Sequence, residues 1–335
     1  MLDANRVSTD PAWFPVDLHV PDRVFRFLEV TLDAIERSTF LDTRIEAPLD
    51  LAQAVPMGSL PLLPSPPRLD WIFHTSFCGS TLLARALHVA PEQVVLREPL
   101  VFRRLGDARR SGWRVEEFLA PVVGLLGREW TPGGRVIVKP THAALNVAAD
   151  LMSAVPQSRA MMLGSPLSDF LVSNLKKTRE TQAKIPELAE RALSASRLGP
   201  KLPRAALAPP GLLEAAVLQW AAQRELSIEL VERTGEDRIM FVDAQSLFAD
   251  PAATALRCAR WFGSTVDPVA IERVASTVAG RNAKAPDVPY SARQRLEEAA
   301  HVRARYDSEL RRAHAWFEAW VLPHMSPRAA GHLGG

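Results

Sequence analysis

The stretch Asp70-Trp-Ile-Phe-His-Thr-Ser-Phe-Cys-Gly-Ser-Thr-Leu-Leu-Ala-Arg-Ala-Leu87 decides how the rest of the chain is interpreted. Its apolar residues 71–73 predict a buried strand, and its apolar residues from Leu82 to Leu87 recur at helical spacing. A turn of small and hydroxyl residues lies between the two. A strand that passes through such a turn into a helix offers unpaired backbone N–H groups to an anion. The stretch therefore fits a phosphate-binding turn, and it also fits an ordinary capped strand–turn–helix.

Three residues of this turn are candidates for anion binding. Gly79 allows the backbone to approach an anion closely, and Ser80 and Thr81 can donate hydrogen bonds through their hydroxyl groups. The alternative is that Ser80 or Thr81 caps the helix. The order of the elements further along the chain favours binding over capping.

The composition limits the class of protein. The 335 residues are 47% hydrophobic and 23% charged, as in an ordinary globular protein, and the net charge of +2 argues against general nucleic-acid binding. Two cysteines, Cys78 and Cys258, cannot form a disulfide framework, so we expect a reduced, cytoplasmic protein. No apolar run approaches the ~20 residues of a membrane span, and the His and Cys spacing supports no metal site.

Short apolar segments alternate with helical patterns through the middle of the chain. The segments expected to be strands are residues 71–74, 94–96, 135–138, 160–163 and 238–242. This alternation predicts an α/β fold, a doubly wound and mostly parallel sheet of about five strands with flanking helices. In such sheets the ligand binds beyond the carboxyl ends of the strands.

The part of the chain before this core is expected to pack on it as an N-terminal extension, residues 1–65. A strand is expected at 24–30 and a helix at 32–38. Five prolines between residues 55 and 67 predict a linker to the first core strand.

The core domain is expected to span residues 66–335 and to carry two helical additions. Residues 178–236 form a predicted helical insert, and residues 291–322 a single C-terminal helix. A basic run from Lys176 to Arg204 is interpreted as a solvated helical face, with a mobile lid over an anionic substrate as the alternative.

Three polar residues follow predicted strands and are candidates for chemistry. Glu98 could act as a general base, or it could form a salt bridge with Arg97. His142 suits proton transfer because its pKa lies near neutrality, with a cap or loop histidine as the alternative. Lys139 could stabilise a leaving group, or it could be a surface lysine at a strand end.

The order of these pieces resembles the P-loop sulfotransferase superfamily between about residues 70 and 295. Residues 76–83 resemble its 5′-phosphosulfate loop, and Leu96-Arg-Glu-Pro99 is similar to the Lys-Glu that follows the second strand in heparan-sulfate-type members. Residues 163–177 and 242–263 resemble two further elements of the superfamily. Arg281-Asn-Ala-Lys284 lies where bacterial members carry a basic loop.

The resemblance implies an enzyme that moves a sulfuryl group from 3′-phosphoadenosine 5′-phosphosulfate to an acceptor hydroxyl or amine, without a metal. It implies Glu98 as the base, Lys139 at the leaving group and His142 as a second candidate base. The acceptor is expected to be a small molecule, a saccharide or a lipid. The oligomeric state stays open, with a homodimer as one expectation. The residues expected to bind the donor are Ser76, Gly79, Ser80, Thr81, Leu82, Ser173 and Lys284.

Two departures from the family pattern motivate an alternative. Phe77 and Gly164 stand where the family has basic residues that bind phosphate. A sulfotransferase-fold protein that binds a ligand without catalysis is therefore the second hypothesis. It predicts a neutral pocket, whereas the enzyme requires replacement cations near residues 75–81, for which the candidates are Lys139, Lys176, Lys177, Arg281 and Lys284.

A nucleotide-dependent kinase is the third hypothesis. It is disfavoured because the chain lacks the Gly-x-x-x-x-Gly-Lys-[Ser/Thr] loop, and with it the lysine that reaches the transferred phosphate.

Overall fold

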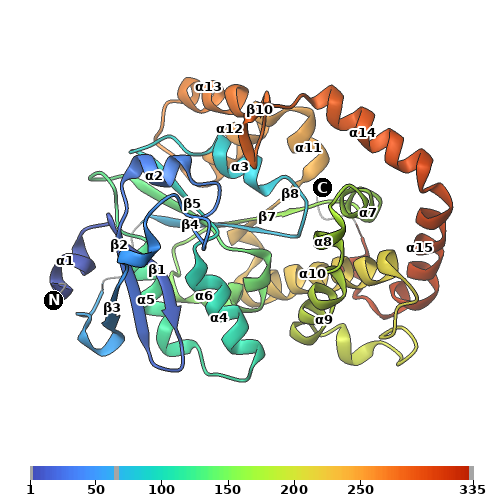
Figure 1. The fold of residues 1–335 in the computed structure, drawn as a ribbon, viewed down its shortest axis with the longest axis horizontal. Helices are drawn as coiled ribbons and strands as arrows, with labels where there is room; N and C mark the ends of the chain where they lie inside the picture. Colours follow the sequence, from blue (N-terminus) through green and yellow to red (C-terminus); the bar gives the residue numbers. More distant parts are fainter. Residues whose placement is uncertain (1–2, 64–67, 332–335) are drawn as a thin grey trace.

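The computed structural model describes residues 3–63 and 68–331 (Figure 1). Its centre is a five-stranded parallel sheet in the order β5-β6-β4-β7-β8. The strands are β4 (Leu69–His74), β5 (Gln93–Arg97), β6 (Arg135–Lys139), β7 (Ala160–Gly164) and β8 (Ile239–Asp243). All five predicted strands are present, and the predicted α/β class is confirmed.

Side chains alternate between the two faces of this sheet, since successive residues of a strand point in opposite directions. On β4, Ile72 packs with helices α3 (Ser80–Ala86), α12 (Pro251–Trp261) and α13 (Pro268–Ala279). These three helices lie above the sheet in Figure 1.

The opposite face receives Trp71 and Phe73, which are fully buried. They pack with α4 (Leu100–Arg110), α5 (Glu116–Leu126) and α6 (Ala148–Ala154). The chain enters α6 through a 3₁₀ turn, η3 (His142–Val147).

The N-terminal part forms a second, antiparallel sheet in the order β1-β2-β3. Its strands are β1 (Trp13–His19), β2 (Val24–Glu29) and β3 (Gln53–Pro56), and helices α1 (Ala4–Thr9) and α2 (Leu32–Arg37) accompany them. The expected strand at 24–30 and helix at 32–38 are confirmed. The linker expected from residue 55 starts too early, because residues 55 and 56 pair with β2; its residues 64–67 lie outside the described residues.

The region 178–236 is helical, as expected. It contains α8 (Arg179–Gln182), α9 (Ile185–Ala195) and α10 (Leu212–Thr234). Helix α10 is buried along most of its length, packed among α7 (Leu167–Leu175), α9 and α15 (Asp307–Trp320). A helix enclosed in this way carries no one-sided apolar stripe.

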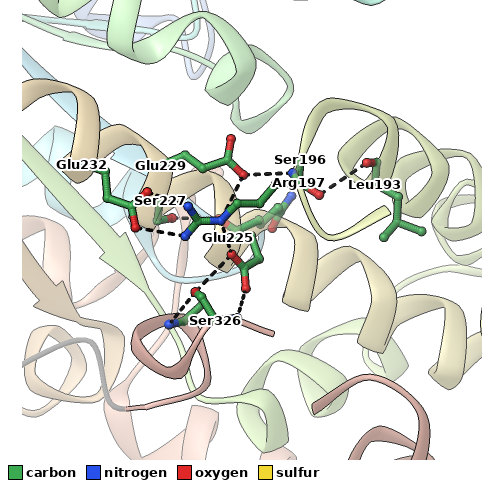
Figure 2. Close-up of polar contacts among 10 residues, drawn as sticks. Leu193, Ser196, Arg197, Glu225, Ser227, Glu229, Glu232 and Ser326 are labelled. Carbon is green, nitrogen blue, oxygen red and sulfur yellow. Dashed lines mark hydrogen bonds and ion pairs between the residues drawn. The ribbon is translucent and has the colours of Figure 1, made fainter. Parts of the chain in front are cut away.

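A polar cluster fixes α10 against its neighbours (Figure 2). The Glu225 carboxylate is fully buried; it accepts hydrogen bonds from Arg197 Nε at 2.9 Å and from the Ser326 backbone N–H at 2.5 Å. Arg197 also donates to both oxygens of Glu232. The cluster thereby ties the segment after α9 and the start of α16 (Pro327–Ala330) to one side of α10.

The C-terminal region contains two helices, so the prediction of one helix over 291–322 is wrong. Helix α14 (Ala292–Arg305) ends at Tyr306, whose φ of −115° and ψ of 27° depart from helical values, and α15 follows. The break has a packing cause: α15 buries Ala313 in the α10 core, whereas α14 has no buried residue and runs along the outer edge in Figure 1. None of the described helices combines the length and the hydropathy needed to cross a membrane.

Candidate active site

A cavity of about 570 Å³ lies at the carboxyl ends of the central strands. The loop after β4 leads to α3 on one face of the sheet, while the loop after β6 leads to η3 and α6 on the other. Two neighbouring strands whose connections leave on opposite faces form a topological switch point, which is where ligands bind in open α/β sheets. Every predicted site residue except Lys139 lines this cavity: Ser76, Gly79, Ser80, Thr81, Leu82, Glu98, His142, Ser173 and Lys284.

The turn after β4 has a constrained backbone. Gly79 is the N-cap residue of α3 with φ +83°, and no side chain caps this helix. Ser80 and Thr81 belong to the first helical turn, so the interpretation of either as the cap is wrong. Phe77 has φ +58°, a conformation that residues other than glycine rarely adopt and that is found disproportionately at functional sites.

Gly79 has a packing role in addition to its backbone conformation. A Cβ atom at this position would lie 2.7 Å from Phe248 Cζ and 3.2 Å from Leu247 Cδ2. Both residues belong to α11 (Ala244–Ala249). The room that the glycine creates is therefore filled by α11, while Gly79, Ser80 and Thr81 all line the cavity.

Two glutamines of α10 hold Ser76 in place. Gln219 Nε2 and Gln223 Nε2 donate to Ser76 Oγ at 3.0 and 3.1 Å, and the Ser76 backbone N–H donates to Gln223 Oε1 at 3.0 Å. No pattern in the sequence indicated these partners, because they lie more than 140 residues away on α10. They fix the start of the turn to the core of the molecule.

Glu98 and Lys139 form an ion pair at the floor of the cavity. Lys139 is fully buried, and its Nζ lies 2.5 Å from Glu98 Oε1 and 3.3 Å from Nε2 of the buried His74. The interpretation of Lys139 as a surface lysine is therefore wrong. Glu98 has φ +55°, and its N–H donates to the Lys139 carbonyl at 2.7 Å.

The alternative pairing of Glu98 with Arg97 is also wrong. The Arg97 side chain is buried and donates to the carbonyls of Glu36 and Ser38 at 3.0 and 2.8 Å, which lie at the end of α2. Adjacent residues thus serve different purposes: Arg97 holds the N-terminal part, and Glu98 faces the cavity.

Both candidate bases are in their proton-accepting forms at neutral pH. Burial raises the pKa of Glu98, but the charge and the hydrogen bond of Lys139, together with the charge of Lys284, outweigh it, so the pKa lies below its ordinary value. Burial is also the largest influence on His142, and with Lys139 it lowers the pKa to about 4 despite Glu98. His142 Nδ1 lies 3.4 Å from Gln223 Nε2. A carboxylate and a neutral imidazole are the forms that general-base catalysis requires.

Basic side chains converge on the turn from outside its own sequence. Lys176, Lys177, Arg281 and Lys284 all line the cavity. Lys177 Nζ lies 4.9 Å from the ring centroid of Phe77. A cation therefore lies beside Phe77, the position at which the family pattern has a basic residue and this chain does not. Burial, together with the charges of Lys284 and Lys176, lowers the pKa of Lys177 to about 8. The neutral pocket that the binding-protein hypothesis predicts is absent from the described residues.

Two cationic residues of the cavity wall were not predicted. Arg44 comes from the N-terminal part, and Arg295 comes from α14. No motif pointed to either, since both reach the cavity only through tertiary packing. Gly164 is the second position at which the chain departs from the family pattern. It ends β7 beside Thr75. Ser173, from the same stretch of sequence, lies on α7 and lines the cavity.

The cavity has basic and hydroxyl side chains, which suit an anionic ligand. Among the described residues there is no cluster of three or more His, Cys, Asp or Glu side chains that could hold a metal ion. Cys78 is buried, and burial raises the pKa of its thiol to about 11, which disfavours a nucleophilic role.

Comparison with known proteins finds similarity to solved structures of sulfotransferases. No family model matches the chain, and no curated protein matches it. Among solved structures it is similar to a sulfotransferase from Alicyclobacillus acidocaldarius, with 15% identity, a TM-score of 0.39, and coverage of 73% of this chain and 96% of that one.

Two further solved structures give similar values. The sulfotransferase domain from the curacin biosynthetic pathway has 9% identity and a TM-score of 0.40, covering 72% of this chain and 98% of that one. A sulfotransferase from Mycobacterium avium has 12% identity and a TM-score of 0.40, covering 74% and 77%. At these values the likeness carries no evidence about activity, which must come from the residues of the cavity.

Proposed function

We propose that this protein is a sulfotransferase that uses 3′-phosphoadenosine 5′-phosphosulfate as sulfuryl donor. The observation that carries the proposal is the convergence of Lys176, Lys177, Arg281 and Lys284 on one cavity with the 75–81 turn. The donor is an anion at each end, and charge-assisted hydrogen bonds to its phosphates are about twice as strong as neutral ones. In this proposal these four residues supply the positive charge that the chain lacks at Phe77 and Gly164.

In this proposal the donor and acceptor occupy different parts of the cavity. Ser80 and Thr81 donate to the 5′ end of the donor, and Ser173 with the surrounding cations holds the rest. Glu98 takes the proton of the acceptor hydroxyl or amine as its lone pair attacks sulfur, with His142 as the second candidate base. The bond between sulfur and the bridging oxygen breaks, and 3′-phosphoadenosine 5′-phosphate leaves.

Lys139 acts indirectly in this scheme. Its ammonium is enclosed beneath the cavity and bonded to Glu98. It therefore orients the carboxylate and keeps it ionised. The negative charge that develops on the leaving group is stabilised by the basic side chains of the cavity wall. The acceptor is proposed to be a small molecule, a saccharide or a lipid.

A donor-binding protein without catalysis is the second candidate. The ion pair between Lys139 and Glu98 favours it, because it engages the carboxylate that should act as base and holds its pKa down. Both candidates predict binding of 3′-phosphoadenosine 5′-phosphate, and only the enzyme releases this product from the sulfated donor when an acceptor is added.

Titration calorimetry with 3′-phosphoadenosine 5′-phosphate tests the proposal. The wild-type protein should bind, and Ser80→Ala combined with Thr81→Ala should weaken binding by about tenfold or more, since two hydroxyl donors are lost. The matched control replaces Thr9 and Ser308, two hydroxyl residues outside the cavity wall, by alanine. Absence of binding heat and of a thermal shift at millimolar ligand would exclude this donor. Equal affinities of the two double variants would show that the donor binds at another site.

A further inference from the structure

One wall of the cavity is formed by residues on either side of β10 (Ala285–Pro289), from the segment 279–284 and from 290–298, where α14 begins. This wall is held by polar contacts. The Arg295 guanidinium lies 3.7 Å from the ring centroid of Phe248 and donates to its carbonyl at 3.2 Å. Arg303 pairs with Asp169 of α7. Since α14 has no buried residue, these contacts position the helix.

A three-residue contact lies on this wall, between α7 and α14. Lys176 Nζ forms an ion pair with Glu298 Oε2 and donates to the Tyr290 hydroxyl at 3.2 Å. The Tyr290 hydroxyl in turn donates to Glu298 Oε2 at 2.7 Å. All three residues line the cavity. One carboxylate oxygen thus receives an ammonium and a phenol hydroxyl together.

This arrangement has the chemistry of an oxyanion site. A lysine ammonium and a hydroxyl donor on one oxygen serve a phosphate oxygen as well as a carboxylate oxygen. The Glu298 side chain is 47% exposed and sits on a helix without a buried face, so it can leave Lys176 without disturbing a core. The Lys176 side chain is only 23% exposed and faces the cavity.

We propose that Lys176 and Tyr290 form a phosphate subsite of this cavity, for which the Glu298 carboxylate is a built-in competitor. A phosphate group of the ligand displaces Glu298 and takes over its two donors. The identification of that ligand with 3′-phosphoadenosine 5′-phosphate rests on the proposed function. The proposal of the subsite and of its competitor rests only on the contacts between Lys176, Tyr290 and Glu298.

The test compares Glu298→Gln with Glu297→Gln. Both remove one charge from α14, but Glu297 pairs with Arg293 and is not part of the cavity wall. In calorimetry at low salt with 3′-phosphoadenosine 5′-phosphate, E298Q should bind three- to tenfold tighter than wild type, and E297Q should bind like wild type. The gain should shrink in 0.5 M salt because the competing interaction is ionic. It should disappear in the Lys176→Met background.

The outcomes separate this inference from the proposed function. If the wild type binds the nucleotide and E298Q binds no tighter than E297Q, the competitor role is overturned and the donor proposal stands. If the wild type does not bind it, the donor proposal fails and inorganic pyrophosphate becomes the probe. A tighter fit to pyrophosphate in E298Q alone supports the subsite, and equal affinities overturn it. Glu298→Ala repeats the comparison should E298Q not fold.

Discussion

Glu98 shows how a single backbone conformation sets the chemistry of the cavity. Strands β5 and β6 pair so that Arg97 lies beside Lys139, and the left-handed φ of the next residue turns the Glu98 carboxylate onto the Lys139 ammonium. The position of Glu98 at a strand end was predictable from the sequence. Its partner was not, because the pairing depends on which strand lies beside β5.

At the residue scale, two histidines with lowered pKa values, His88 and His142, predict a loss of stability in mild acid. Burial lowers the pKa of His142 to about 4 and that of His88 to about 3, from 6.5. Above pH 6.5 both are neutral whether the chain is folded or unfolded. Below it the unfolded chain gains protons first, so the free energy of unfolding should fall by about 2 kcal/mol per histidine at pH 5.

Urea unfolding at pH 7, 6 and 5 measures this effect. Between pH 7 and pH 5, the free energy of unfolding of His142→Gln should fall less than that of the wild type. The difference should equal the contribution of one histidine, about 2 kcal/mol. A free energy of unfolding that is the same at pH 7 and pH 5 would contradict the burial of these imidazoles in their neutral form.

At the scale of elements, the strands were predictable and the helix ends were not. Apolar runs between turn residues located all five central strands, because a strand buried on both faces is apolar throughout. The break at Tyr306 and the 3₁₀ start at His142 depend on what each segment packs against. Gln219 and Gln223 could not be predicted for the same reason, because they contact Ser76 only when α10 packs against the turn after β4.

The element-scale prediction concerns the cluster of Figure 2. Glu225→Ala should lower the free energy of unfolding by about 3 kcal/mol, since it leaves Arg197 and the Ser326 N–H without their buried partner. Glu232→Ala removes a half-exposed partner of the same arginine and should cost about 1 kcal/mol or less. Thermal and urea unfolding of both variants give the comparison, and similar losses would show that the buried carboxylate has no special role.

At the scale of the whole molecule, the N-terminal sheet and the central sheet share one apolar core. Phe25 and Phe27 of β2 belong to the same cluster as Trp71 and Phe73 of β4. We propose on this basis that residues 3–63 fold together with the rest of the described chain. The sequence predicted an extension that packs on the core, joined to it by a proline-rich linker, but it did not indicate that the two parts share one apolar core.

Phe25→Ala tests this cooperativity. Phe25 is fully buried, so its truncation should lower the free energy of unfolding of the whole chain by about 3–4 kcal/mol in a single transition. Leu51→Ala is the control, since Leu51 is 62% exposed and should change little. Circular dichroism and tryptophan fluorescence should report the same midpoint; an early transition confined to one signal would show that the N-terminal part unfolds alone.

The two buried thiols have a practical consequence. Burial raises the pKa of Cys78 to about 11 and that of Cys258 to about 12, and both are enclosed in the core. Toward maleimides and iodoacetamide the folded chain should therefore behave as if it had no cysteine. A cysteine introduced at the exposed Glu297 would carry a fluorophore alone, and the release of the neighbouring Glu298 side chain from Lys176 could be followed in solution by its emission.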